Sequence, residues 1–252
     1  MVALGYVLAF VIGLTLGMLG GGGSILTVPV FVYVLGIDPK LAIAMSLPVV
    51  GTTSLVGAIG HWRAGNVRVR TALPFGLVAM AGAFTAARLS VRLAGRTQLF
   101  VLGTTMLVAA TFMLVGAPGT RGGDAGGAKP APLPLFLAVG FAVGGLTGVI
   151  GIGGGFLIVP ALVVLAQVPM RQAVGTSLLV ITMNSLAGFA GQAHVGEIPL
   201  GVVITFTIIA IGGILVGTRL VRSVKQAALK RAFAVLLLVI AVLLLWQNRG
   251  ML

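Results

Sequence analysis

Long apolar stretches constrain this chain more than any other feature of its sequence. They lie at about residues 4–36, 41–60, 72–90, 97–116, 134–167, 172–192, 199–220 and 227–247. A helix needs roughly 20 mostly apolar residues to cross a hydrocarbon core of about 30 Å. Because 59% of the residues are hydrophobic and only 8% are charged, a water-soluble fold would lack polar surface. The sequence therefore predicts an all-α integral membrane protein that crosses the plasma (inner) membrane several times.

The two sets of four apolar segments are repeats of one another. The first set carries GLTLGMLGGGGSILTVPVFV from Gly13, and the second carries GGLTGVIGIGGGFLIVPALV from Gly144, an offset of 144 − 13 = 131. Other matches at this offset are Gly17 with Gly148, Ser46 with Ser177 and Ser54 with Ser185. We therefore expect a first membrane repeat at 1–116, a flexible Gly- and Pro-rich linker at 117–133 and a second membrane repeat at 134–252, which together form one membrane domain.

Glycines interrupt the first apolar segment of each half. That segment is roughly 33 residues long, against about 20 for an ordinary span. The interrupting residues are Gly20, Gly21, Gly22 and Gly23 in the first half and Gly151, Gly153, Gly154 and Gly155 in the second. Glycine costs about 1 kcal/mol relative to alanine inside a helix, so we expect each helix to break there. Lipid cannot satisfy the freed backbone groups, so each break must be buried in protein or line a water-filled cavity.

The paired breaks predict a binding site for an anion. Matched interruptions in two halves are the best sequence indication of a transporter's substrate site. Half-helices that begin near Ser24 and near Phe156 would direct free N–H groups and positive dipole ends into the cavity. We therefore assign the interrupting glycines and Ser24 to substrate binding. The alternative is close helix packing, which the four-residue spacing of Gly13, Gly17 and Gly21 also favours.

Polar side chains within the second segment of each half are further candidates for the anion site. They are Ser46, Thr53 and Ser54 in the first half and Ser177, Asn184 and Ser185 in the second. Such groups donate hydrogen bonds without adding fixed charge, so a bound anion can still be released. The alternative is that the hydroxyls bond to their own backbone or to a neighbouring helix. At the segment ends, Arg63 and Gln192 could meet the anion at a cavity mouth, although Arg63 also suits a lipid headgroup contact.

The orientation of the two halves depends on whether each glycine break reverses the chain. The connection after the second segment carries Arg63, Arg68 and Arg70 in the first half but no Lys or Arg in the second, which favours inversion. The connection after the third segment is basic in both halves, which favours a parallel arrangement. Of the two, we favour inverted repeats.

Four stretches carry a family resemblance: GGGGSILTVPVF, GIGGGFLIVPAL, HWRAGNVR and QAHVGEIP. They resemble the sulfite exporter TauE/SafE family of membrane permeases, and the resemblance covers nearly the entire chain. It implies a duplicated unit of about four apolar segments and a permease for small anions. Sulfite, sulfoacetate and other organosulfur compounds are the substrates associated with the family. The resemblance does not identify the substrate of this chain, because the family is functionally mixed.

The scarcity of reactive side chains argues against catalysis. The chain has no cysteine and only three acidic residues, Asp38, Asp124 and Glu197, none in the middle of an apolar run. We therefore expect no enzyme activity, no cofactor and no bound metal. The net charge of +13 comes from Lys and Arg in the connections, so we expect the lipid bilayer rather than nucleic acid as a partner. The sequence leaves open whether the chain forms a homo-oligomer.

The leading hypothesis is a secondary transporter, either a permease or an exporter, for a small anion. It would work by alternating access, with one half moving against the other around the broken helices. A passive anion channel is the closest alternative, and it would lack the counterflow that a carrier shows. A third hypothesis is a membrane scaffold that transports nothing and whose glycines serve only helix packing.

Overall fold

The computed structural model describes residues 2–90, 92–115, 131–150, 155–192, 198–221 and 226–247. Within these ranges every regular element is a helix, and no strand occurs. The first half forms α1 (Val2–Leu19), α2 (Gly22–Pro29), the π-helix η1 (Val30–Val34), α3 (Pro39–Arg63), α4 (Val69–Ser90) and α5 (Gly95–Val115). The second half forms α6 (Leu133–Ile150), α7 (Gly155–Val164), α8 (Met170–Gly191), α9 (Leu200–Leu220) and α10 (Gln226–Gln247).

These helices confirm the predicted all-α membrane protein. Among the described residues, α3, α4, α6, α8 and α9 are long and apolar enough to cross a membrane. The first apolar segment of each half is divided into two helices, α1 with α2 and α6 with α7. Residues 117–130 of the predicted linker lie outside the described residues, so the proposed boundary between the halves stays a prediction.

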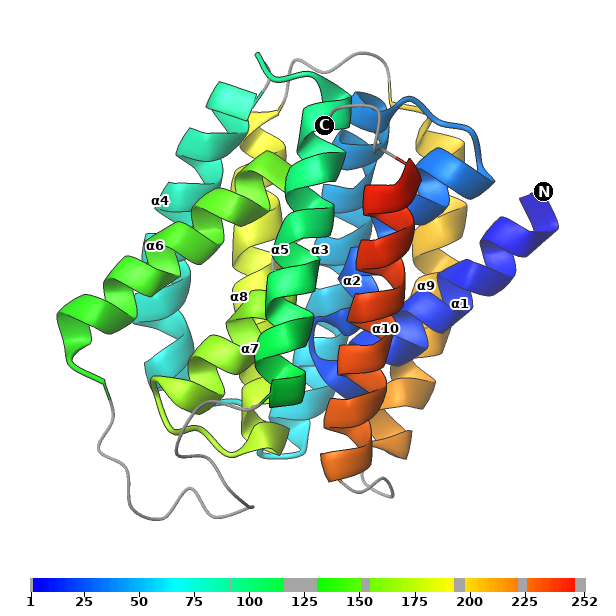
Figure 1. Ribbon diagram of the computed structural model, residues 1–252. Coiled ribbons are helices and arrows are strands. Elements are labelled where there is room, and N and C mark those ends of the chain that lie inside the picture. Colours follow the sequence, from blue (N-terminus) through cyan, green and yellow to red (C-terminus); the bar gives the residue numbers. More distant parts are fainter. Residues whose placement is uncertain are drawn as a thin grey trace.

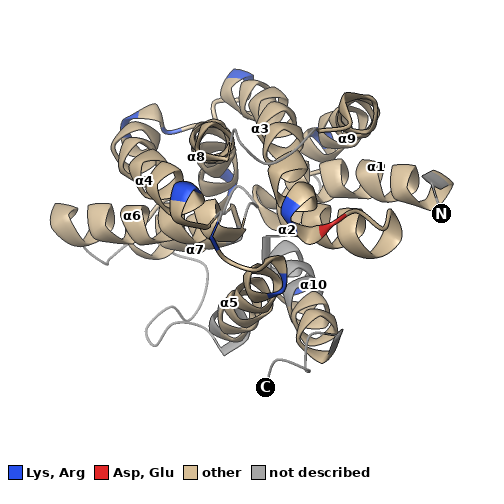
Figure 2. Cartoon of the chain, turned by 90° about the horizontal axis from the view of Figure 1, so that it is seen from above, with Lys and Arg blue, Asp and Glu red and all other residues tan. Residues whose placement is uncertain are grey.

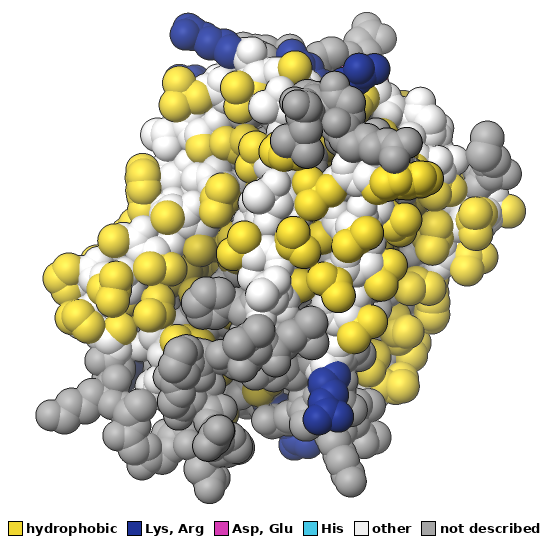
Figure 3. Space-filling model, in the orientation of Figure 1, with side chains coloured by type: hydrophobic (Ala, Val, Ile, Leu, Met, Phe, Trp, Pro, Cys, Tyr) yellow, Lys and Arg dark blue, Asp and Glu magenta, His cyan; other side chains and the backbone are white. Residues whose placement is uncertain are grey.

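The surface matches a lipid environment. Yellow apolar side chains cover the middle of the face shown in Figure 3, and Lys and Arg side chains lie at its upper and lower ends. Large apolar residues that face outward include Leu77, Leu133, Leu200, Ile208 and Val239. In water this much exposed apolar surface would promote association, whereas lipid tails solvate it.

The first helix of each predicted repeat packs against a helix of the other predicted repeat. Helix α1 packs on α9 of the second half, and its repeat counterpart α6 packs on α4 of the first half. Helices α5 and α10 form a separate pair on one side of the molecule (Figure 2). The centre belongs to α3 and α8, since 72% of the apolar window of each is buried, against 33 to 39% for α4, α6 and α9.

Glycines allow α1 and α6 to approach their partners closely. A Cβ atom added to Gly13 of α1 would overlap the backbone carbonyl of Ala210, and one added to Gly144 of α6 would overlap that of Ala79. Both pairs are related by the same offset of 131 residues, because 13 + 131 = 144 and 79 + 131 = 210. Gly13 and Gly144 therefore serve helix packing of the small-residue kind.

Two pairs of helices at matching positions of the predicted repeats run in opposite directions. In Figure 1, α3 descends and α8 ascends, while α4 ascends and α9 descends. The contacts between α3 and α8 agree: a Cβ added to Gly51 would lie 3.0 Å from that of Ser185, and one added to Gly188 would lie 3.3 Å from a methyl group of Leu47. As positions rise along α3 they fall along α8, so the two helices cross antiparallel.

Local signals explain where α3 begins. Asp38 precedes the helix, and its carboxylate accepts hydrogen bonds from the backbone N–H groups of Lys40 (2.9 Å) and Leu41 (3.4 Å). Pro39 occupies the first helical position, where a missing N–H costs nothing. This cap fixes the start of a helix that carries several of the candidate site residues.

Candidate functional site

The first glycine run breaks the helix between α1 and α2, as predicted. Gly20 has φ of +71°, a left-handed conformation that glycine adopts without strain. Its N–H donates to the carbonyl of Leu16 over 2.8 Å, which ends α1. Helix α2 then begins at Gly22, two residues before the predicted start at Ser24, and no side chain caps its N-terminus. The uncapped N–H groups leave a partial positive charge at this point.

The first break is buried in protein rather than open to water. All four residues from Gly20 to Gly23 are buried. A Cβ added to Gly23 would overlap the carbonyl oxygen of Ile12, and one added to Gly21 would overlap the backbone of Gly155. We expected each break either to be buried in protein or to line a water-filled cavity. At this break the structure shows burial in protein.

One residue of the second glycine run contacts the first run. Gly151, Gly153 and Gly154 lie outside the described residues, but Gly155 is the first residue of α7, one residue before the predicted start at Phe156. The backbone of Gly155 lies against Gly21, so residues from the two predicted breaks are in contact. Gly155 therefore meets the first glycine run where α2 and α7 begin.

One face of α8 carries residues that lie beside the contact between Gly21 and Gly155 and one turn beyond it. The hydroxyl of Ser177 lies 2.6 Å from the carbonyl oxygen of Gly20, to which it donates, and 2.8 Å from that of Val174. One turn later, the side chain of Ile181 lies against Gly155. Asn184 follows at the next turn, and positions 177, 181 and 184 share a helix face. Ser177 thus holds the first break in place, and Asn184 lies one turn beyond it.

Several candidate hydroxyls are occupied by their own helices. Ser24 donates to the carbonyl of Gly21, Ser46 to that of Ile43 and Thr53 to that of Val49, each over 2.7 Å. A hydroxyl has a single proton, so these groups can donate to a substrate only after they rotate. For these three hydroxyls the structure therefore favours the alternative interpretation, in which each bonds to its own helix backbone.

Three other candidates are buried without any hydrogen-bond partner among the described residues. They are Ser54 (0% exposed), Asn184 (0%) and Ser185 (1%). Ser54 and Ser185 are repeat equivalents on either side of the α3–α8 crossing, where Ser185 faces Gly51 one turn before Ser54. Leaving a buried polar group unpaired costs about 1–3 kcal/mol, so native structures rarely keep such groups without a reason.

Gln192 and its repeat equivalent His61 make matching contacts near opposite ends of the molecule. The Nε2 atom of His61 lies 3.2 Å from the carbonyl oxygen of Gly17 on α1. The side-chain amide of Gln192 donates to the carbonyl of Gly148 on α6 over 3.4 Å, and 17 + 131 = 148. Both side chains are buried. The first contact ties α3 to α1, and the second ties the residue after α8 to α6, each close to a glycine run.

Arg63 lies apart from the central polar groups. It is exposed at the end of α3 and lines a pocket of about 500 Å³ with His61, Ala64, Asn66, Arg171 and Val221. The structure therefore does not bring Arg63 together with Ser54, Asn184 and Ser185. Sequence reasoning assigned all four to substrate binding, with Arg63 at a cavity mouth.

Sequence reasoning missed several polar residues. The hydroxyl of Thr27, inside α2, is buried without a partner among the described residues. Gln98 of α5 donates to the carbonyl of Val149, just before the second glycine run, over 2.9 Å. Each is a polar side chain in apolar surroundings, a signal that could have singled it out. No group of three or more His, Cys, Asp or Glu side chains able to hold a metal occurs in the described ranges.

Comparisons with known proteins converge on a single family. A family model described as sulfite exporter TauE/SafE matches residues 6–244. A probable membrane transporter protein of Xylella fastidiosa (strain 9a5c) is 31% identical over 240 residues, covering 94% of this chain and 92% of that protein. The probable membrane transporter protein YdhB of Bacillus subtilis (strain 168) is 25% identical over 226 residues, covering 88% of this chain and 91% of that protein. No solved structure matches the chain significantly.

Proposed function

Because the chain belongs to the sulfite exporter TauE/SafE family and is a multi-pass membrane transporter, we propose that it is a secondary transporter for a small anion. The substrate classes that we propose are sulfite, sulfoacetate and related organosulfur compounds. The anion crosses the membrane chemically unchanged, by alternating access around the glycine-broken helices.

The observation that carries this proposal is the set of buried, unpartnered donors at the α3–α8 crossing. Ser54 and Ser185 supply hydroxyl protons, and Asn184 supplies two amide N–H groups. All are neutral, so they can hold an anion by hydrogen bonds and still release it. Hydrogen bonds to a charged group contribute about 1.5–3 kcal/mol each, enough to offset the cost of leaving these donors unpaired in the empty state.

The glycine breaks add to the same site. The uncapped N-terminus of α2 supplies a partial positive charge, and Ser177 joins the break at Gly20 to the face of α8 that carries Asn184. An anion between α3 and α8 would therefore lie within one or two helical turns of the broken helices. The closed packing of Gly21 on Gly155 corresponds to a state in which the anion path is shut.

Inverted repeats supply the two exchanging states. The opposite directions of α3 and α8, and of α4 and α9, support an inverted relation between the halves. The matched contacts of His61 with Gly17 and of Gln192 with Gly148 would act as closures, one towards each side of the membrane. Opening one closure while the other stays shut would expose the central donors to one side at a time.

Flux into proteoliposomes tests this function. The purified chain is reconstituted and offered sulfite, sulfate, thiosulfate, sulfoacetate and small carboxylates, with and without a pH gradient. We expect saturable uptake of at least one sulfur oxyanion, accelerated when the vesicles contain unlabelled substrate. Uptake without such acceleration would indicate a channel, and the absence of flux for every anion would favour the non-transporting scaffold. Protein-free vesicles give the background.

A further inference from the structure

Asn184 differs from the other central polar residues in what it can offer a ligand. Its side chain is 0% exposed, and neither its amide nitrogen nor its amide oxygen has a hydrogen-bond partner among the described residues. The nitrogen carries two donors, whereas the oxygen can only accept. The side chain therefore presents a buried acceptor that is satisfied only by a donor on the ligand.

The two serines at the helix crossing do not impose this requirement. The hydroxyls of Ser54 and Ser185 can each rotate to donate a proton to an oxygen atom of an anion. An anion made only of acceptor atoms would satisfy these hydroxyls and the N–H groups of Asn184, but it would leave the amide oxygen buried and unpaired, which weakens binding. An anion with an O–H or N–H group of its own would satisfy every one of these groups.

Asn184 lies where such a ligand can meet both the serines and the first glycine break. Ser185, the next residue of α8, faces Gly51 of α3. Ser177, which shares a helix face with Asn184, donates to the carbonyl of Gly20 over 2.6 Å. The amide therefore belongs to the side of α8 that faces the broken helix, next to the side that carries Ser185.

The amide has no counterpart in the first half of the chain. At the repeat offset Asn184 corresponds to Thr53, because 53 + 131 = 184. The hydroxyl of Thr53 donates to the carbonyl of Val49 over 2.7 Å. The crossing thus has one serine from each half but an unpaired amide from the second half alone. This arrangement suits a ligand that is itself unsymmetrical, with a proton on only one of its oxygen atoms.

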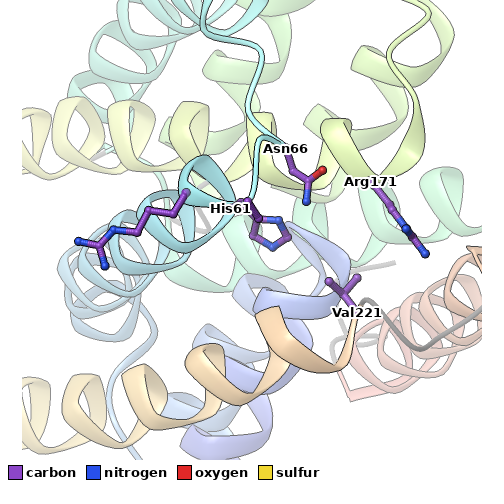
Figure 4. A pocket seen from close by; sticks show the side chains of 6 residues that line it. His61, Asn66, Arg171 and Val221 are labelled. Atoms are coloured by element: carbon purple, nitrogen blue, oxygen red, sulfur yellow. The ribbon is translucent and has the colours of Figure 1, made fainter.

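The surroundings also favour a ligand with a single negative charge. Among the described residues, the buried polar side chains are neutral except for the ionisable His61, which lies about two helical turns beyond Ser54 and contacts Gly17. Figure 4 shows His61 at this end of α3, with the guanidinium group of Arg171 directed away from it. The free energy needed to bury an ion rises with the square of its charge, so neutral donors compensate a monoanion better than a dianion.

We infer that the central site recognises a monoanion that carries a hydrogen-bond donor of its own, which among the sulfur oxyanions is hydrogen sulfite rather than sulfite or sulfate. The proton of the ligand is donated to the amide oxygen of Asn184, and the other oxygen atoms accept from Ser54 and Ser185. A hydroxysulfonate would offer the same chemistry through its hydroxyl group. The inference rests on the proposed transport function for its site and specifies the form of the substrate.

This form of the substrate has a consequence for protons. Hydrogen sulfite that crosses the membrane takes its proton with it, and part of that proton is released on the receiving side. Sulfite transport would therefore move protons without a proton-carrying side chain in the protein.

Two sulfonates of equal charge test the donor. Isethionate and ethanesulfonate are both monoanions and differ by one hydroxyl group. Each is titrated against the detergent-solubilised full chain at constant ionic strength, and the rise in Tm gives an apparent Kd. We expect the wild type to bind isethionate about tenfold more tightly than ethanesulfonate. In Asn184→Leu, which keeps a similar volume without a polar group, the two Kd values should become equal. Asn184→Ala replaces this variant if it does not fold.

Thr207→Val is the matched control for Asn184→Leu. Thr207 is buried in α9, and its hydroxyl donates to the carbonyl of Val203 over 2.7 Å. The variant also exchanges a buried polar side chain for an apolar one, but it should keep the wild-type preference for isethionate. Loss of the preference in both variants would assign it to general stability rather than to the amide of Asn184.

A titration with sulfite tests the inorganic form of the ligand. From one pH unit below the pKa of hydrogen sulfite to one unit above it, the Kd for total sulfite should rise about tenfold, as the share of hydrogen sulfite falls. The charge of isethionate does not change in this range, so its Kd should stay constant. An equal rise for isethionate would assign the effect to a protein group such as His61 and overturn the assignment to the ligand. Sulfate, a dianion throughout, should not stabilise the protein.

The outcomes separate this inference from the transport function. Equal wild-type Kd values for the two sulfonates would refute recognition of the donor. If neither sulfonate binds, sulfite decides: a smaller pH dependence in Asn184→Leu than in the wild type supports the inference, and the same dependence in both refutes it. If the binding preference holds while vesicles show no flux, the site stands and the transport function fails. Saturable flux of sulfate equal to that of hydrogen sulfite would leave transport in place and overturn the inferred form of the substrate.

Discussion

A buried hydroxyl without a hydrogen-bond partner lowers the stability of the fold, so the fold alone does not explain why it is there. Ser54 and Ser185 lie fully inside the helix crossing and bond to nothing among the described residues, while Ser90 in α4 is equally buried but donates to its own backbone. The first two side chains resemble donors kept ready for a ligand, and the third resembles an ordinary membrane-helix serine. A mutation should separate the two kinds of serine.

We predict that Ser54→Ala and Ser185→Ala weaken substrate binding without weakening the fold. Removing an unpaired hydroxyl removes its desolvation cost, so Tm in detergent should stay constant or rise. Losing a hydrogen bond to a charged ligand should raise the transport KM about tenfold or more. Ser90→Ala is the control, with an unchanged KM. A lowered Tm together with a wild-type KM would instead return Ser54 and Ser185 to a packing role.

At the scale of single helices, glycines decide which surfaces can meet. Gly13 and Gly144 occupy equivalent points on α1 and α6, where the neighbouring backbone leaves no room for a methyl group. Gly212 lies in α9 but has no atom within 4 Å of an added Cβ. All three glycines are helical, but an added side chain would meet backbone at Gly13 and Gly144 and open space at Gly212. Gly212 is therefore a matched control for the other two.

We predict that Gly13→Ala and Gly144→Ala each destabilise the protein by about 1–3 kcal/mol, because α1 and α6 must move away from their partners. Gly212→Ala should be neutral or stabilise the protein by up to about 1 kcal/mol, since alanine is the better helix former. Thermal unfolding in detergent measures all three. The packing explanation would be wrong if Gly144→Ala were as harmless as Gly212→Ala.

For the whole molecule, the packing of α1 and α6 on the other predicted repeat changes which bodies can move. Because α1 packs on α9 of the other predicted repeat through Gly13 and Gly17, we expect α1 to move with α9 rather than with the rest of its own repeat. Opening the His61–Gly17 closure must instead separate α3 from the α1–α9 pair. The chain has no native cysteine, so engineered disulfides can test this directly.

We predict that a disulfide between Gly60→Cys on α3 and Thr218→Cys on α9 blocks transport. A Cβ added to Gly60 would lie 4.0 Å from that of Thr218, within the range of about 3.5–4.5 Å that a disulfide bridges. Oxidation should lower flux at least tenfold, and reduction should restore it. The control joins Ala86→Cys to Gly145→Cys within the α4–α6 pair, also at 4.0 Å, and should leave flux unchanged. Equal flux in the oxidised and reduced Gly60–Thr218 variant would show that α3 and α9 move together.

Much of this architecture follows from local sequence, and the rest depends on contacts across the repeats. Apolar length predicted the helices and the run of glycines from Gly20 predicted the first break, because both signals lie within short segments. The packing of Gly21 on Gly155 was not predictable, and neither was the lack of hydrogen-bond partners for Ser54 and Ser185 among the described residues. Each depends on residues far away in the chain. Arg171 was missed for the same reason: it joins Arg63 in a pocket only once α8 lies beside α3.

The partnership of α1 with α9 also has a consequence for biosynthesis. Gly13 must wait for Ala210, which follows 210 − 13 = 197 residues later, whereas the Gly144 surface of α6 finds its partner α4 already made. At about 5–20 residues per second, α1 spends roughly 10–40 s in the bilayer before the ribosome delivers α9. During that interval its glycine-lined face has only lipid or the insertion machinery to cover it, so α1 is the helix whose docking completes the nascent protein.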